Sequence, residues 1–162
     1  MRIITINTWK GDGDYPRRLA LLAAGLQELA PDVLCLQESL QVPHSGPDTA
    51  RHLADRLQLN LAWAPSRLKK RHVTGRPRPC FSGLAILSRH PIRQHRRLAL
   101  PAHRKDPERI AQWIDIAVDH HVWRVVNLHL THIREAAALR QKQLTETLAQ
   151  VDRCGSPDTA WL

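Results

Sequence analysis

The chain has 162 residues, of which 43% are hydrophobic and 24% are charged, and these values are typical of one globular domain with its own core. They exclude a disordered chain, and the seven glycines and 11 prolines are too few for a collagen-like or low-complexity protein. No apolar run approaches the roughly 20 residues that a membrane-spanning helix needs. The three cysteines share no Cys-x-x-Cys spacing, which argues against a zinc ribbon and predicts a reducing, cytoplasmic location.

The positive charge is concentrated in one part of the chain. The formal net charge is +9, and residues 66–109 alone hold 13 basic and two acidic side chains, a net charge of +11. Such a field attracts phosphate-bearing partners, whereas a basic run by itself is more often a solvated surface. Because the chain has one tyrosine and one phenylalanine, we expect few platforms on which the bases of single-stranded nucleic acid could stack.

Strands and helices are expected to alternate in the first third of the chain. A Gly-Asp-Gly-Asp turn follows the first strand. The next segment is predicted to be a helix because its leucines form one stripe, Leu19, Leu22, Leu26 and Leu29. A continuous apolar run then predicts a strand covered on both faces, and Asp48 is placed to cap a second helix that ends at Leu57. The expected elements are strand 2–8, helix 17–30, strand 33–36 and helix 48–57.

Strands predominate in the remainder. Residues 65–79 are expected to form a basic loop, and Asp119-His120-His121 to turn a hairpin. The last helix is expected to direct four apolar side chains inward, Ala137, Leu144, Leu148 and Val151. The expected elements are strands 59–64, 84–87, 92–100, 110–118 and 122–127, then helix 135–151 and the opening of another strand at 159–162. Adjacent hairpins followed by helices predict an α/β domain with a mixed sheet and outer helices.

Two polar residues are expected at the ends of neighbouring strands. Glu38 follows the apolar run at residues 33–36, and Asn7 ends the first strand. A carboxylate at a sheet rim can hold a hard cation such as Mg²⁺, and a nearby amide can orient that carboxylate or bind a phosphoryl oxygen. By spacing alone, a strand-end Glu and a turn-forming Asn are the more ordinary interpretation.

Two histidines lie at the end of another apolar strand. His129 could donate a hydrogen bond to a phosphate or act as an acid or base, and His132 follows three residues later. A zinc site would need three or four converging ligands, and a pair is easily accidental among ten histidines.

Four stretches, taken in order, resemble the N-terminal half of the endonuclease/exonuclease/phosphatase superfamily, also called DNase I-like. The most specific is Pro-Asp-Val-Leu-Cys-Leu-Gln-Glu at 31–38, which is similar to the strand that carries the metal ligand. The others are residues 3–9, which contain Asn7, residues 82–92, and residues 125–130, which contain His129. The resemblance implies a four-layer α/β/β/α fold, a two-layer β-sandwich with outer helices, of which only the N-terminal half is expected here.

The same resemblance implies particular site residues. Asn7 and His129 would be catalytic, and Glu38 with Asn7 would hold Mg²⁺ or Mn²⁺. Arg109 is a looser candidate for a phosphate contact. Members of this superfamily continue with Gly-Asp-x-Asn and Ser-Asp-His motifs, and neither occurs here. We therefore expect residues 1–162 to be a single, C-terminally incomplete domain that has little activity alone and self-associates through exposed sheet edges.

The function expected for the parent protein is metal-dependent hydrolysis of a phosphodiester or phosphomonoester. Nucleic acid, phosphoinositides and phospholipid head groups would all be attracted to the basic segment. Its first four cations are the expected contacts, Arg67, Lys69, Lys70 and Arg71. A non-catalytic basic module that binds phosphate or nucleic acid is the alternative from another class, and a small structural domain with incidental charge is the third.

Overall fold

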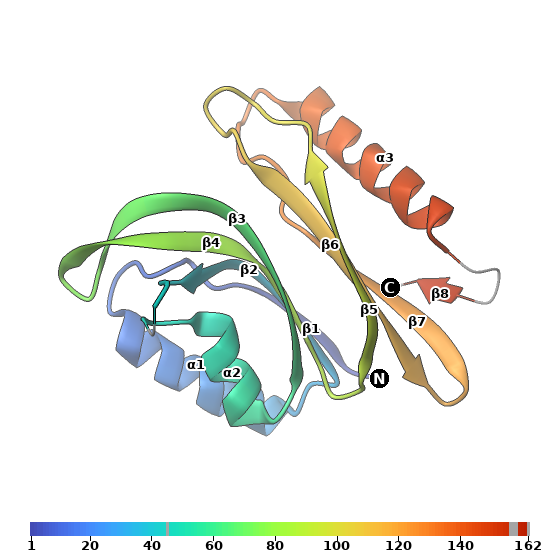
Figure 1. Cartoon of the computed structure of the whole chain (residues 1–162), viewed down its shortest axis with the longest axis horizontal. Coiled ribbons are helices and arrows are strands. Elements are labelled where there is room, and N and C mark those ends of the chain that lie inside the picture. Colours follow the sequence, from blue (N-terminus) through green and yellow to red (C-terminus); the bar gives the residue numbers. More distant parts are fainter. Residues whose placement is uncertain (45, 156–158, 162) are drawn as a thin grey trace.

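Two four-stranded sheets pack face to face in the computed structural model, which describes residues 1–44, 46–155 and 159–161. Helices α1 and α2 lie together on the outer face of the first sheet, and α3 lies along the second (Figure 1). In chain order the elements are β1 (Ile3–Asn7), α1 (Tyr15–Leu29), β2 (Val33–Gln41), α2 (Thr49–Leu57), β3 (Asn60–Val73), β4 (Arg76–Ser88), β5 (Ile92–Leu100), β6 (Arg109–Val118), β7 (His121–Leu128), α3 (Ala137–Arg153) and β8 (Thr159–Trp161). The expected α/β/β/α arrangement is confirmed.

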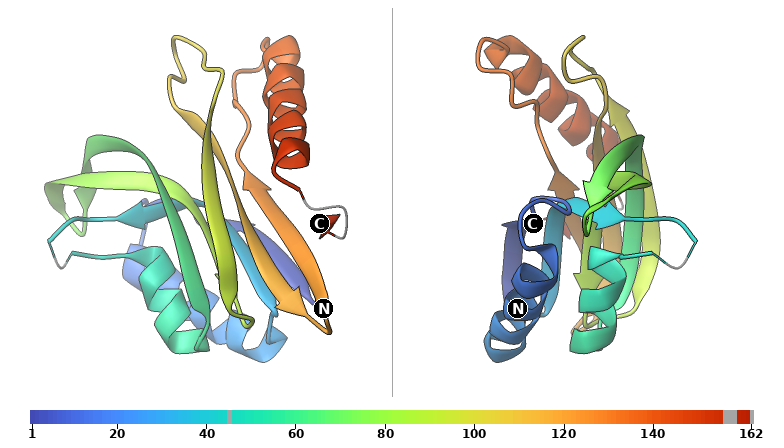
Figure 2. Two further views of the ribbon diagram at one scale, coloured as in Figure 1. Left: turned by 45° about the vertical axis from the view of Figure 1, so that its right-hand side comes forward. Right: turned by 90° about the vertical axis from the view of Figure 1, so that its left-hand side faces the viewer.

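Both sheets are mixed. The first has the order β1-β2-β4-β3, with β1 parallel to β2 and the other pairs antiparallel. The second has the order β5-β6-β7-β8, in which only β7 and β8 are parallel. Figure 2 shows the layers from two further sides. Among the helices that the structure describes, none is long and apolar enough to traverse a bilayer.

Strand β2 contributes to two cores at once. Leu34 and Leu36 pack against the helices on one face, whereas Val33 and Cys35 pack against β6 and β7 on the other. All four side chains are buried, as the continuous apolar run predicted. Burial raises the pKa of the Cys35 thiol to about 12, so this side chain is an apolar packing residue at neutral pH.

The prediction of a basic loop at residues 65–79 is wrong. This segment forms most of a long β3–β4 hairpin, whose register runs from Asn60 opposite Ser88 to Val73 opposite Arg76. The chain reverses at Thr74 and Gly75, and both have the positive φ angles that a tight hairpin turn requires. The predominance of Lys and Arg concealed the strand. A strand is recognised in a sequence by an alternating apolar face, and here that face is buried only in part.

The predicted leucine stripes are partly wrong. In α1, Leu26 is buried but Leu29 at the helix end is 50% exposed. In α3, Ala137, Leu144 and Leu148 are exposed, and the buried face consists of Gln143, Thr147 and Val151. Polar side chains can occupy this face because hydrogen-bond partners, several of them from other parts of the chain, satisfy them.

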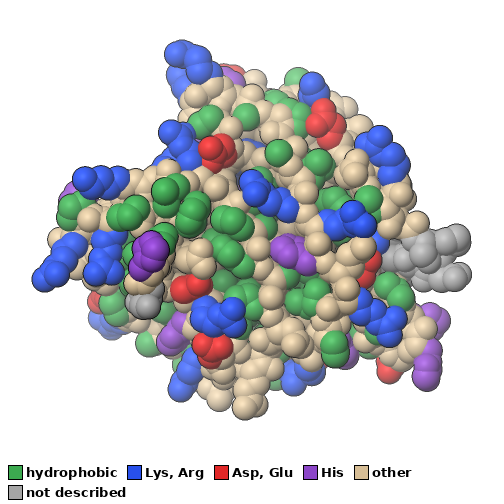
Figure 3. Space-filling view, in the orientation of Figure 1, with side chains coloured by type: hydrophobic (Ala, Val, Ile, Leu, Met, Phe, Trp, Pro, Cys, Tyr) green, Lys and Arg blue, Asp and Glu red, His purple; other side chains and the backbone are tan. Residues whose placement is uncertain are grey.

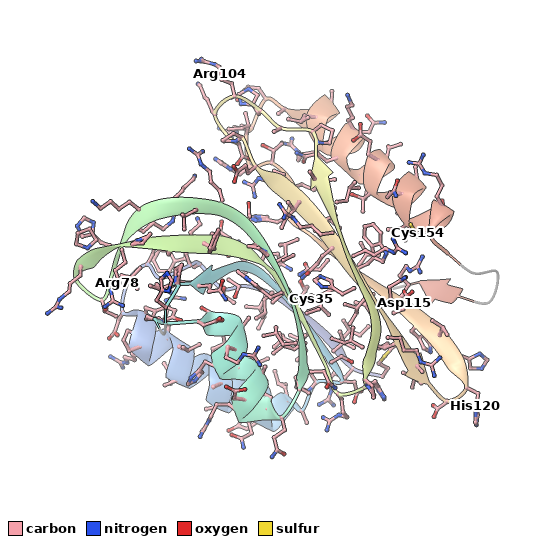
Figure 4. All side chains as sticks on the ribbon, viewed as in Figure 1. Cys35, Arg78, Arg104, Asp115, His120 and Cys154 are labelled. Carbon is pink, nitrogen blue, oxygen red and sulfur yellow. The ribbon has the colours of Figure 1, made fainter. Side chains whose placement is uncertain are left out.

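Helix α3 is attached to the second sheet mainly through polar groups. Gln143 accepts a hydrogen bond from the Thr131 amide (2.9 Å) and donates one to the Pro101 carbonyl (2.7 Å). At the other end of the helix, buried Arg124 forms two 2.7 Å bonds with Asp115 and also donates to the carbonyl oxygens of Val151 and Cys154. Figure 4 places Asp115 and Cys154 on facing sides of this junction.

An irregularity in β2 separates Glu38 from the regular ladder. The β2–β4 register shifts between Leu36 and Ser39, and Glu38 has a φ of 53°. The buried amide of Asn127, from β7, donates to the carbonyl oxygens of Leu36 (2.9 Å) and Ala85 (3.0 Å) and accepts from Gln37 (2.8 Å). Asn127 therefore joins the two sheets at the point where Glu38 leaves the ladder.

A second amide reinforces this junction. Gln112, from β6, is assigned with its carbonyl oxygen accepting from the backbone N–H groups of Ala85 (3.0 Å) and Ile86 (3.2 Å) and its amide donating to His95 (3.0 Å). Two amide side chains of the second sheet thus satisfy backbone groups of the first.

Replacing Asn127 by Leu should lower the free energy of unfolding by at least about 2 kcal/mol, because two buried carbonyl oxygens would lose their donor. Urea unfolding of the chain measures this. The matched control is Asn60→Leu, because Asn60 also donates to two carbonyl oxygens but is itself exposed. An equal loss in both variants would contradict a special role for the buried amide.

Candidate active site

A pocket of about 180 Å³ lies between the β3–β4 hairpin and the segment that joins β5 to β6. In Figure 4, Arg78 marks the outer part of the hairpin and Arg104 marks the tip of the β5–β6 segment. Most of the charged lining is basic, and its ionisable residues are Lys10, Glu38, Arg67, Lys69, Arg71, Lys105, Asp106, Glu108, Arg109, His129 and His132. The pocket therefore suits an anionic ligand.

Glu38 lines this pocket, and its carboxylate is paired with the Lys10 ammonium at 3.1 Å. The Lys10 amide also donates to the Glu38 carbonyl, which ties the loop after β1 to the irregular part of β2. Asn7 pairs with Gln37, the residue before Glu38, but does not line the pocket. The Asn7 side-chain oxygen accepts a hydrogen bond from the Trp9 amide at 2.9 Å.

The donor set fits a sparsely coordinated Mg²⁺ or Mn²⁺ better than a closed metal site. Within the described ranges, no three His, Cys, Asp or Glu side chains converge in a way that could hold a metal. Mg²⁺ commonly uses one or two carboxylates together with water and substrate phosphates, so a single carboxylate with an adjacent amide is compatible with it. The Lys10 ammonium neutralises Glu38 in this structure, so a metal bound by the carboxylate would have to displace or share this partner.

Arg109 is the centre of the hydrogen bonds opposite Glu38. Its guanidinium donates to Asp106 (2.7 Å), to His129 Nδ1 (2.9 Å) and to His132 Nδ1 (2.8 Å). Because arginine has no acceptor, each Nδ1 must be the accepting nitrogen, and a neutral ring then carries its proton on Nε2. Arg109 thus fixes the tautomer of His129 as an Nε2–H donor.

The charge of the Arg109 cluster is set by burial and by the guanidinium. Burial and the Arg109 charge both lower the pKa of His129 below its ordinary value of 6.5, so its ring is neutral at pH 7. Burial opposes ionisation of Asp106, but hydrogen bonds from Arg109 and Thr131 outweigh it, and the pKa of Asp106 is lowered. The cluster is therefore a charged Arg–Asp pair with the neutral imidazole of His129 beside it.

The basic hairpin presents alternate residues to the pocket. Arg67, Lys69 and Arg71 line it, whereas Lys70 does not. Burial, with the neighbouring Arg67 and Arg71 charges, lowers the pKa of Lys69. None of these three takes part in an ion pair within the part of the chain that the structure describes. Figure 3 shows basic side chains gathered over the β3–β4 hairpin at the left of the view.

The structure brings most of the predicted site residues together. Glu38, His129, Arg109, Arg67, Lys69 and Arg71 line one pocket, and Asn7 lies beside the strand residue that precedes Glu38. Sequence reasoning missed Lys10 and Asp106. Lys10 follows the Asn7 strand closely, and that position was the available signal, whereas nothing local indicates that Asp106 pairs with Arg109.

Comparison with known proteins identifies both a family and a fold. The family model described as Endonuclease/Exonuclease/phosphatase family matches residues 4–155. No match was found among curated proteins. The structure is similar to an endonuclease/exonuclease/phosphatase family protein from Leptotrichia buccalis, with 17% identity and a TM-score of 0.73, covering 99% of this chain and 64% of that one.

Two further solved structures have the same fold. The human Nocturnin catalytic domain with bound sulfate is 20% identical with a TM-score of 0.73, and 95% of this chain covers 58% of it. D. rerio TDP2 complexed with a single strand DNA product is 15% identical with a TM-score of 0.71, and 98% of this chain covers 56% of it. The chain thus spans less than two thirds of each of these structures.

Replacing Arg109 by Gln should raise the pKa of His129, because burial would remain but the neighbouring positive charge would be removed. NMR titration of the imidazole resonances measures the shift, and exposed Arg104→Gln is the matched control. In the unsubstituted chain the pKa of His129 is lower in the folded state than in the unfolded state. As the pH falls, the unfolded imidazole is therefore protonated before the folded one. The contribution of His129 to stability should therefore decrease as pH falls through 6.5. An unchanged or lower pKa in Arg109→Gln would contradict this account.

Proposed function

The chain belongs to the endonuclease/exonuclease/phosphatase family, and from this membership we propose that it supplies part of the active site of a metal-dependent phosphoesterase acting on nucleic acid. The supporting observation is that Glu38 and His129 line one pocket whose other charged residues are mainly cations. A carboxylate for a metal and a neutral hydrogen-bond donor for a phosphoryl oxygen are the groups that such hydrolysis needs.

The proposed roles follow from the position and charge of each side chain. Glu38, with Asn7, would hold Mg²⁺ or Mn²⁺, which when bound supplies Lewis-acid stabilisation of phosphate charge. The Asn7 amide oxygen accepts from Trp9 through one lone pair and has a second for the metal, and its NH₂ group can donate to an anionic oxygen. His129 donates Nε2–H to the phosphate, and Arg109 holds that ring in position through Nδ1.

Nucleic acid is the polyanion that best suits the hairpin. Arg67, Lys69 and Arg71 lie at alternate strand positions, about 6.5 Å apart along the strand. A line of cations beside the reacting groups can follow a phosphate backbone, whereas a single head group would engage only one or two of them. The D. rerio TDP2 structure, which has the same fold, is complexed with a single strand DNA product. This complex supports nucleic acid as the ligand here only by analogy of fold.

We also propose a cytoplasmic location and self-association. Three free cysteines, Cys35, Cys80 and Cys154, support a reducing compartment. Strand β1 is at one edge of its sheet, and its alternate residues Ile3, Thr5 and Asn7 are exposed, which supports pairing with a second chain.

Replacing Glu38 by Gln should reduce Mg²⁺- or Mn²⁺-dependent hydrolysis of a phosphodiester by at least about a hundredfold, because a metal ligand contributes more than its supporting residues. The assay measures cleavage of an oligonucleotide. It is run on this chain and, in parallel, on any longer natural protein that contains the same sequence. Glu28→Gln on the exposed face of α1 is the control.

The Glu38→Gln variant should stay folded, since the carboxylate adds little to the packing of the core. It should bind the oligonucleotide at least as tightly as the unsubstituted protein, because the change removes a negative charge and frees the Lys10 ammonium. Oligonucleotide binding without turnover in both proteins would instead support a non-catalytic binding module.

Replacing Arg67, Lys69 and Arg71 together by Gln should weaken oligonucleotide binding and flatten its salt dependence. The slope of log affinity against log salt should decrease by roughly 0.7 for each phosphate of the single strand that the hairpin no longer neutralises. The matched control is the Gln triple at Arg93, Arg96 and Arg97, which are exposed on β5. Equal effects of the two triples would show that the hairpin contributes only general charge.

A further inference from the structure

The loop after β1 holds two residues in an unusual backbone conformation. Trp9 and Lys10 both have a φ of 50°, in the left-handed region that residues other than glycine rarely adopt. Arg18, from α1, compensates by donating to the carbonyl oxygens of Thr8 (2.8 Å), Lys10 (3.2 Å) and Asp12 (2.8 Å). One guanidinium therefore fixes a strained loop, and strain of this kind occurs at functional sites as well as at turns and helix ends.

The residue presented by this loop is Trp9. Its side chain is 54% exposed, although indole is among the largest apolar groups that a chain can bury. The Arg18 guanidinium lies 5.1 Å from the ring centroid, which supports the ring through a cation–π contact. Gly13 provides room at the edge of the ring, because a Cβ there would lie 3.2 Å from the indole. The ring is held on its protein side and open to solvent elsewhere.

Trp9 precedes Lys10, which lines the pocket, although the indole itself is not part of the pocket lining. The Trp9 amide donates to the Asn7 side chain, and the next residue, Lys10, is paired with Glu38. A ligand could therefore stack on the indole and place a phosphate near Glu38 only if it carries a flat ring close to its phosphodiester. Nucleotides have this arrangement, whereas inositol phosphates and simple phospholipid head groups have no aromatic ring.

We propose that Trp9 is a stacking platform for one base of a single-stranded nucleic acid whose phosphodiester occupies the Glu38–His129 pocket. This inference rests on the proposed function and adds the strand state of the substrate, because a base inside a duplex is stacked on both faces and has none free for an indole. The expectation of few stacking platforms counted only tyrosine and phenylalanine, and Trp9 would be one such platform.

The test compares two fluorescently labelled strands with the same number of phosphates, a short oligothymidylate and an abasic strand, by anisotropy in EDTA. The unsubstituted chain should bind oligothymidylate roughly tenfold more tightly, as expected for one stacked base. Trp9→Ala should remove this preference while keeping the affinity for the abasic strand. Trp9→Phe should retain part of it, and Leu21→Ala, which removes another exposed apolar side chain from α1, should retain all of it.

Three results would overturn the proposal. These are equal affinity of the unsubstituted chain for both strands, an equal loss for both strands in Trp9→Ala, and tighter binding of a duplex formed by the oligothymidylate and its complement than of the oligothymidylate alone. Thermal unfolding confirms that each variant is folded. Because the experiment measures binding without metal, its failure is distinct from failure of the Glu38→Gln assay, which measures turnover.

Discussion

The hydrogen bonds of the buried Asn127 amide are the interaction on which the arrangement of the site depends. A sandwich core is held by apolar burial, which is strong but has no direction. The amide adds direction, because its three bonds are satisfied only when Leu36, Ala85 and Gln37 of the first sheet are in one register with β7. Glu38 follows Gln37, and His129 follows Asn127 by two residues. The interaction that aligns the sheets thereby also sets the positions of the carboxylate and the imidazole.

Arg109 determines the charge and hydrogen-bonding state of the side chains around it in the pocket. A carboxylate and two imidazoles in one pocket could adopt many protonation states, and a guanidinium that binds all three restricts them. Asp106 remains ionised beside it, and His129 remains neutral with a known tautomer. The hairpin cations are outside this arrangement and have no acidic partner in the described structure, so they are the part of the pocket available to an external polyanion.

The sequence was informative where a pattern is local and less so where distant residues decide. The continuous apolar run at residues 33–36 predicted burial on both faces of β2. Glu38 and His129 line one pocket, but β2 continues to Gln41, so Glu38 lies at an irregularity within the strand and not at its end as expected. The β3–β4 hairpin was missed because its cations obscure a two-residue periodicity. The buried face of α3 was missed because Gln143 is acceptable inside only when the Thr131 amide and the Pro101 carbonyl are present, and no local pattern reveals them.

The polar contacts that attach α3 to the second sheet also connect this helix to the pocket through a series of hydrogen bonds. Gln143 holds the Thr131 amide, the Thr131 hydroxyl donates to Asp106 at 2.7 Å, and Asp106 accepts from Arg109, which orients His129. A leucine in place of Gln143 would suit the helix better as an apolar surface, yet it would release the first member of this relay. The helix therefore buries less apolar surface, and in return Gln143 helps to position the pocket residues. Natural variation at residue 143 should be limited by the position of the His129 ring, four hydrogen-bonded steps away, rather than by the packing of the helix itself.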